Sequence, residues 1–163
     1  MTDQPILTSS TYDEGSVLHL AFSKPKGNVI DRDLVAALDA AIAAAANAVE
    51  VRVILIEGLG KNFSYGASVE EHLPDQVASM LAGFHGLFRT MIKTSTPLLA
   101  VVRGHCLGGG LELAAFCHRV FAAPEAKLGQ PEINLGVFAP VASAVLPYRC
   151  GQVVADDLLL SGR

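Results

Sequence analysis

Two short apolar runs, separated by a longer segment with helical periodicity, constrain the fold of this chain most strongly. The runs "VRVILIE" (residues 51–57) and "LLAVVR" (residues 98–103) are rich in β-branched and aliphatic residues, which is typical of strands buried on both faces. Apolar residues recur between them at helical spacing: Val77, Met80, Leu81, Phe84, Leu87, Phe88 and Met91. Strands that alternate with helices predict an α/β or α+β fold with parallel crossover connections, and we take α/β as the fold class.

The flanking segments extend this pattern. Asp13-Glu14-Gly15 predicts a hairpin turn between two short N-terminal strands. Asp31 or Asp33 is expected to cap a helix that runs to about Val49. The apolar face of that helix contains Leu34, Leu38, Ile42 and Val49. Residues 140–163 predict two short helices, broken at Pro147 and Gly151. Their apolar residues would need a surface to pack on: Val153, Leu158, Leu159 and Leu160.

Composition excludes several classes of protein. The chain has 163 residues, of which 51% are hydrophobic and 17% charged, and this balance predicts one folded domain (1–163) rather than disorder. A net charge of -4 without a basic block argues against nucleic-acid binding. No apolar run is long enough to span a membrane, and the N-terminus lacks the pattern of a signal peptide. Three cysteines, Cys106, Cys117 and Cys150, indicate free thiols and a cytoplasmic protein.

The stretch "GHCLGGGLELAAFCHR" (residues 104–119) places three consecutive glycines before a helical pattern. No lysine follows them, as a Walker phosphate loop requires, and Leu113 stands where the dinucleotide fingerprint has its third glycine. No zinc-binding motif occurs, so no metal site is predicted. Each of the five scattered histidines is expected to be a surface residue or a satisfied polar residue.

The remaining interpretation is a strand, a glycine turn and the N-terminus of a helix. Backbone N–H groups in a first helical turn lack internal partners and favour an anion. Glu112 follows Gly109 by about one turn, so the two can face the same space. An oxyanion donor beside a carboxylate suits chemistry next to a carbonyl. When the three glycines and Glu112 are considered alone, a tight packing turn, with Glu112 at the favourable end of the helix dipole, is the preferred explanation.

Two further segments favour the functional interpretation. "KLGQPEINLGVF" places Glu132 in an apolar, turn-forming segment, twenty residues after Glu112. "FSYGAS" is a turn of small residues after a buried strand, where the Ala67 N–H could be a second backbone donor. The glycine turn with Glu112, the Glu132 segment and the turn at Ala67 are each weak evidence for an active site. Together, and in this order along the chain, they are a specific signal.

These residues resemble the crotonase (enoyl-CoA hydratase/isomerase) superfamily. The strings that carry the resemblance are "LHLAFSKPKGNVIDRDLVAAL", "NFSYGASVEEH" and "STPLLAVVRGHCLGGGLELAAFCHRVFAAPEAKLGQPEINLGV". The resemblance implies a spiral of ββα units and an acyl-CoA thioester substrate. It also implies an oxyanion hole formed by the N–H groups of Ala67 and Gly109. Glu112 and Glu132 match the two catalytic carboxylates of the hydratases, which add water with no cofactor other than the coenzyme A of the substrate.

Departures from the family pattern concern the acyl pocket. Ser68 stands where many members have aspartate, and Phe138, Ala139 and Pro140 stand where many hydratases are glycine-rich. In this respect the chain looks most like the cyclic dienoyl-CoA hydratases. Those enzymes convert cyclohexa-1,5-diene-1-carbonyl-CoA to 6-hydroxycyclohex-1-ene-1-carbonyl-CoA. Phe138 would then shape a ring-sized pocket.

Three expectations concern the rest of the molecule. By the same resemblance, Lys24 and Lys26, with Ala67, would bind the coenzyme A moiety. Family members are longer, so we expect the chain to lack C-terminal helices that complete the pocket and form a homotrimer or a dimer of trimers. Isomerase or hydrolase activity on the same oxyanion hole, or a catalytically impaired CoA-binding fragment, are the alternatives to a hydratase.

Overall fold

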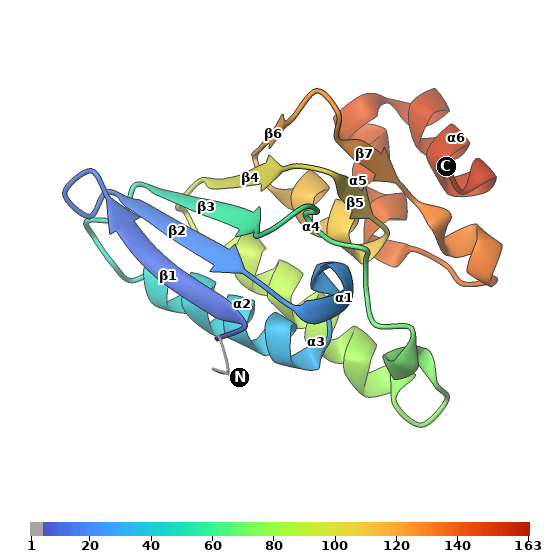
Figure 1. The fold of residues 1–163 in the computed structure, drawn as a ribbon, viewed down its shortest axis with the longest axis horizontal. Helices are drawn as coiled ribbons and strands as arrows, with labels where there is room; N and C mark the ends of the chain where they lie inside the picture. The colour runs from blue at the N-terminus through green and yellow to red at the C-terminus, as the bar shows by residue number, and fades with distance from the viewer. Residues whose placement is uncertain (1–4) are drawn as a thin grey trace.

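A computed structural model of the chain describes residues 5–163, so the first four residues of the N-terminal segment assessed above for a signal peptide lie outside the described part. Five strands form the main sheet in the order β1-β2-β3-β4-β6 (Figure 1). β1 is antiparallel to β2, and every other neighbouring pair is parallel. The strands are β1 (Leu7–Tyr12), β2 (Val17–Phe22), β3 (Val53–Gly58), β4 (Leu98–Val102) and β6 (Arg119–Ala122). The predicted α/β class, N-terminal hairpin and parallel sheet are confirmed.

Helices α2 (Arg32–Ala45) and α3 (Val77–Lys93) lie side by side along one face of this sheet (Figure 1). Asp31 caps α2, since its carboxylate accepts the Leu34 N–H at 3.1 Å. The prediction that α2 reaches Val49 is wrong. The helix ends at Ala45, where the chain turns back toward β3, and Val49 is 91% exposed.

The core lies between the sheet and these helices. It takes alternate residues of the strands, such as Leu20, Ile54 and Ile56, together with the apolar helix faces. The face predicted for α3 is confirmed, because its residues are either buried or partly buried against the core. This layer fixes the ends of the strands, from which the loops described below project.

The resemblance implied more than one sheet, but the two strands of the second sheet were not predicted from the sequence pattern. This sheet pairs β5 (His105–Leu107) with β7 (Lys127–Gly129), each three residues long, and β5 leads through Gly108 into α4 (Gly109–Phe116). Residues 109–115 of α4 are all buried, so this helix crosses the interior instead of covering a surface. A helix buried all round shows no polar face in its sequence.

The C-terminal part contains α5 (Pro140–Cys150) and α6 (Gln152–Ser161), which pack against each other. The break expected at Pro147 is wrong. Pro147 lies inside the last turns of α5, where the helix tolerates the loss of one backbone hydrogen bond, and the chain breaks only at Gly151. Leu158 and Leu159 pack on the core, whereas Val153 is 83% exposed. Within residues 5–163, no helix has the length and apolar composition needed to cross a membrane.

Candidate active site

The loop after β3 holds Ala67 with its N–H group free. The Ile30 N–H donates to the Gly66 carbonyl, and the Ser68 N–H donates to the Ile30 carbonyl, both at 2.9 Å. Hydrogen bonds therefore fix the residues on each side of Ala67. The Ala67 N–H itself donates to no acceptor within residues 5–163. A fixed backbone donor with no internal partner is suited to bind a substrate oxygen.

Ser64 ties this loop to the segment that follows β2. Its hydroxyl donates to the Asn28 carbonyl at 2.7 Å and accepts the Gly66 N–H at 3.0 Å. The Asn28 side chain donates in turn to the carbonyls of Leu59 and Asn62, both at 2.9 Å. Ser64 and Asn28 are buried, so these bonds are shielded from water and hold the loop rigidly.

The three consecutive glycines bring the start of α4 against this loop. Gly108 has φ 52° and ψ −126°, a conformation that strongly favours glycine. A Cβ atom on Gly109 would lie 3.1 Å from the Ala67 nitrogen, and one on Gly110 would lie 2.7 Å from Ser64 Cβ. Gly109 is the first residue of α4, and its N–H donates to no backbone acceptor within residues 5–163. The glycines are therefore a close-approach turn that sets two free N–H groups beside each other.

Glu112 lies one turn further along α4 and is 4% exposed. Its Oε1 accepts the Ala142 N–H, in the first turn of α5, at 2.7 Å. The residue at the N-cap of α5 is Ala139, whose methyl side chain cannot accept a hydrogen bond. Glu112 therefore serves as the cap. Burial raises the pKa of Glu112 to about 7, and the charge of Glu132 adds to the effect, whereas the N–H groups of Ala142 and Val141 oppose it. Glu112 can therefore gain and lose a proton near neutral pH.

This pKa makes a prediction about stability. Because the folded-state pKa exceeds that of an unfolded glutamate, the folded state is favoured most below about pH 4.5, and the advantage is lost as pH rises through 7. In Glu112→Gln this titration is absent, whereas the amide oxygen can still accept the Ala142 N–H. We expect the stability of this variant relative to wild type to increase by up to about 3 kcal/mol between pH 4.5 and 8. Urea unfolding at several pH values measures this, and the exposed Glu70→Gln is the control. A pH-independent difference would contradict the assignment.

Glu132 approaches Glu112 from the 3-10 helix η2 (Pro131–Leu135). Its Oε1 lies against Gly108, where a Cβ atom would come within 2.4 Å of it. Its Oε2 is buried and has no hydrogen-bond partner within residues 5–163. Burial raises the pKa of Glu132, against the opposing influence of its own backbone N–H and of His72. The second carboxyl is thus desolvated and lacks a partner on one oxygen.

These groups line one cavity of about 340 Å³. Seven of the residues predicted for the site lie on its wall: Ala67, Gly109, Glu112, Glu132, Phe138, Ala139 and Pro140. Two free N–H groups and two carboxyls therefore face the same space. Phe138 is 73% exposed and lies at the open side of the cavity.

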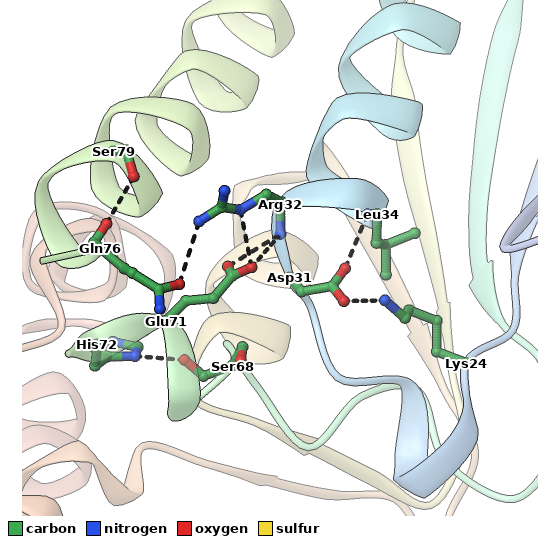
Figure 2. Close-up of polar contacts among 9 residues, drawn as sticks. All are labelled: Lys24, Asp31, Arg32, Leu34, Ser68, Glu71, His72, Gln76 and Ser79. Atoms are coloured by element: carbon green, nitrogen blue, oxygen red, sulfur yellow. Dashed lines mark hydrogen bonds and ion pairs between the residues drawn. The ribbon is translucent and has the colours of Figure 1, made fainter.

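The structure does not place three other predicted residues on this wall. Ser68 is buried, and its carbonyl accepts a hydrogen bond from His72 Nδ1 at 2.7 Å (Figure 2). Lys24 directs its ammonium to Asp31, with which it forms an ion pair (Figure 2). Lys26 is exposed on the turn α1 (Pro25–Asn28). The role of the two lysines in binding coenzyme A stays a prediction.

Other residues on the wall were not predicted. Most are apolar: Val69, Leu73, Met80, Leu81, Phe84, Leu135 and Val137. His72, in the 3-10 helix η1 (Glu70–His72), is the exception. Its hydrogen bond to the Ser68 carbonyl fits the expectation of a satisfied polar residue, but its place on the cavity wall was not predicted. Its position five residues after Ala67 was the one signal in the sequence that could have identified it.

Solved structures share this fold over nearly the whole chain. An enoyl-CoA hydratase from Bacillus anthracis superposes with a TM-score of 0.91 at 24% identity and covers 98% of the chain. One from Thermoplasma volcanium, 30% identical, gives a TM-score of 0.88 and covers 97% of it. The chain spans 64% of each of these two proteins. The fold is therefore the crotonase fold.

The sequence itself matches the enoyl-CoA hydratase/isomerase family over residues 13–163. The chain belongs to this family. It is 52% identical, over 150 residues, to the cyclohexa-1,5-dienecarbonyl-CoA hydratase of Thauera aromatica, with 92% of the chain and 58% of that protein covered. It is 37% identical to a probable enoyl-CoA hydratase of Rhizobium meliloti, with 92% and 60% covered. The chain thus spans about three fifths of the length of these relatives.

Proposed function

We propose that the chain carries the catalytic centre of a hydratase that adds water to a conjugated acyl-CoA thioester. The observation that carries this proposal is the meeting, at one cavity, of two N–H groups without a partner in residues 5–163, the buried Glu112 carboxyl and the half-buried Glu132 carboxyl. The N–H groups of Ala67 and Gly109 would hold the thioester oxygen as negative charge develops on it. One such donor contributes about 3–4 kcal/mol to the stability of a transition state.

The two carboxyls would transfer the protons. One, ionised, accepts a proton from water as the water oxygen bonds to the β-carbon. The electron pair moves to the thioester oxygen and gives an enolate. The other carboxyl, protonated, gives its proton to carbon as the enolate collapses. Raised pKa values for both Glu112 and Glu132 favour this division, since one proton can then reside on the pair at neutral pH. These reaction steps use only groups of the chain, a water molecule and the substrate.

We further propose a cyclic diene as the substrate, cyclohexa-1,5-diene-1-carbonyl-CoA. The similarity to the Thauera aromatica protein supports this assignment, and so does the cavity. Its wall is apolar except for the catalytic groups and His72. A cavity of about 150 Å³ is enough to hold benzene, so about 340 Å³ leaves room for a six-membered ring beside the thioester. In a cross-conjugated ring, charge from attack at the β-carbon spreads to the distant γ-carbon. Protonation there gives 1,4-addition and 6-hydroxycyclohex-1-ene-1-carbonyl-CoA.

Incubation of the full chain with the cyclic dienoyl-CoA and with crotonyl-CoA in ¹⁸O-labelled water tests both levels of the proposal. We expect one labelled oxygen in the product of the diene and a higher kcat/KM for the diene than for crotonyl-CoA. Hydration of crotonyl-CoA alone would eliminate the ring substrate and keep the hydratase. Double-bond migration without label would indicate an isomerase. Binding of coenzyme A esters without turnover would indicate the catalytically impaired fragment.

A further inference from the structure

A second cavity, of about 250 Å³, adjoins the one that contains the candidate active site. Its wall is formed mainly by η2, α5 and α6, together with Gln130, which lies between β7 and η2. Glu132, Val137, Phe138 and Ala139 lie on the walls of both cavities. Glu132 is therefore placed between two spaces, only one of which has been assigned to the substrate.

The side chain of Gln130 is polar, yet the residue is only 1% exposed. Neither its Oε1 nor its Nε2 has a hydrogen-bond partner within residues 5–163, and the same is true of Glu132 Oε2. In this part of the chain, the other buried side-chain atoms without a partner belong to Asp39 and His85, which are not on this wall. A buried amide without hydrogen bonds is costly. Gln130 and Glu132 therefore need a partner that residues 5–163 do not supply.

Hydrogen bonds fix the backbone on both sides of this amide. The Gly108 N–H donates to the Gly129 carbonyl, and the Gln130 N–H donates to the Arg163 carbonyl, both at 2.9 Å. Pro131 follows and restricts the backbone as η2 begins. A movement that carried the Gln130 amide to another group would break these contacts, so the amide is held at the second cavity.

A water molecule can supply the missing hydrogen bonds. Buried water typically makes about three hydrogen bonds to polar groups that lack other partners, and one molecule occupies about 30 Å³. Water can accept an N–H of Gln130 Nε2 and donate an O–H to the ionised Glu132 carboxylate. When Glu132 is protonated, its own O–H donates to the same water. The cavity also opens to solvent, because Asp156 and Leu160 on its wall are exposed.

We propose that Gln130 is a positioning residue that holds an ordered water molecule in the second cavity, hydrogen-bonded to the Glu132 carboxyl. This water orients the carboxyl and lets its proton exchange with solvent while a substrate fills the first cavity. It is distinct from the water that is added to the substrate, which must lie in the first cavity. The catalytic use of Glu132 rests on the proposed function, whereas the bound water is a property of the folded chain alone.

Water–amide cross-peaks in NMR spectra of the ¹⁵N-labelled full chain test for this water. The Gln130 side-chain amide is assigned by its loss in Gln130→Met. A held water molecule gives NOE and ROE cross-peaks of opposite sign, whereas hydrogen exchange with solvent gives cross-peaks of the same sign. We expect opposite signs at Gln130 but not at the amide of Gln152, which is exposed. The cross-peaks should persist in Ser143→Ala, which removes a hydroxyl of the wall that could relay them.

Two substitutions of Glu132 test its part in holding the water. Glu132→Leu removes a hydrogen-bond partner of the water, so the cross-peaks at Gln130 should weaken. Glu132→Gln retains a polar group of the same shape, so they should remain. Native ¹H–¹⁵N spectra establish that each variant is folded. Cross-peaks of the same sign at Gln130 in wild type, or cross-peaks of full strength in Glu132→Leu, would overturn the proposal.

Gln130→Met distinguishes a hydrated amide from an unpaired one, since methionine has a similar size but no N–H group. Loss of a held water should lower the urea midpoint and reduce kcat for the dienoyl-CoA by about 2–10-fold, with KM nearly unchanged. Gln152→Met should keep the wild-type values. A raised urea midpoint would show that the amide is unpaired, and an unchanged kcat would refute the positioning role. If wild type shows no turnover, the proposed function fails, while the cross-peaks still decide whether the water is bound.

Discussion

Glu132→Gln is expected to lower kcat for hydration by about 10²–10⁴-fold, the contribution of a general acid–base group. Glutamine has nearly the same shape as glutamate but cannot exchange a proton with water or with carbon. The side chain should remain near Gly108, so substrate binding is expected to change little and the loss should appear mainly in kcat. Steady-state kinetics on the proposed substrate measure both parameters.

Glu125→Gln is the matched control, because Glu125 is an exposed glutamate in the loop between β6 and β7. It should retain the kinetics of wild type. If Glu112 and Glu132 act as a unit, the double variant should be hardly slower than the slower single variant, since groups that act together have non-additive effects. Turnover by Glu132→Gln within a few-fold of wild type would refute its part in proton transfer.

Local sequence patterns identified the helices that bury one face against the core and expose the other. The cap at Asp31 and the apolar face of α3 were readable because each depends on residues a few positions apart. Helix α4 was only partly readable, since complete burial removes the polar face that defines a helical period. β5 and β7 were missed because three-residue strands have almost no pattern of their own, and their pairing joins segments about twenty residues apart.

In the candidate site, too, features that depend on neighbouring residues could be predicted, whereas features that depend on tertiary contacts could not. The glycines are explained by contacts with Ser64, Ala67 and Glu132, none of which is near them in sequence. The resemblance to a family identified Ala67, Glu112 and Glu132 as partners, but it carried no information about His72. The role of Glu112 as the cap of α5 was equally invisible, because the residue at the N-cap of that helix is an alanine. Residues whose roles depend on tertiary contacts can be identified only from the structure.

Gly108→Ala tests two roles of the glycine turn, which are the placement of the Glu132 carboxyl and the positive φ of the backbone. We expect this substitution to lower kcat/KM by about 10²-fold, because displacement of a catalytic group by about 1 Å can have that effect. The new methyl group would lie 2.4 Å from Glu132 Oε1, so the carboxyl must move away from Gly108. Gly108 also has positive φ, a conformation that is strained for alanine, so the substitution should lower the free energy of unfolding by about 1–3 kcal/mol.

Gly60→Ala provides the comparison needed to interpret that result. Gly60 also has positive φ, at 87°, but a Cβ atom there would meet no atom of residues 5–163 within 4 Å, its chain neighbours aside. It should therefore lose a similar amount of stability in thermal or urea unfolding and keep its activity. If both variants lose stability but only Gly108→Ala loses turnover, the cause is the contact with Glu132 and not backbone strain. Equal losses of activity in the two variants would show that the rigidity of the fold, and not the position of the Glu132 carboxyl, limits the reaction.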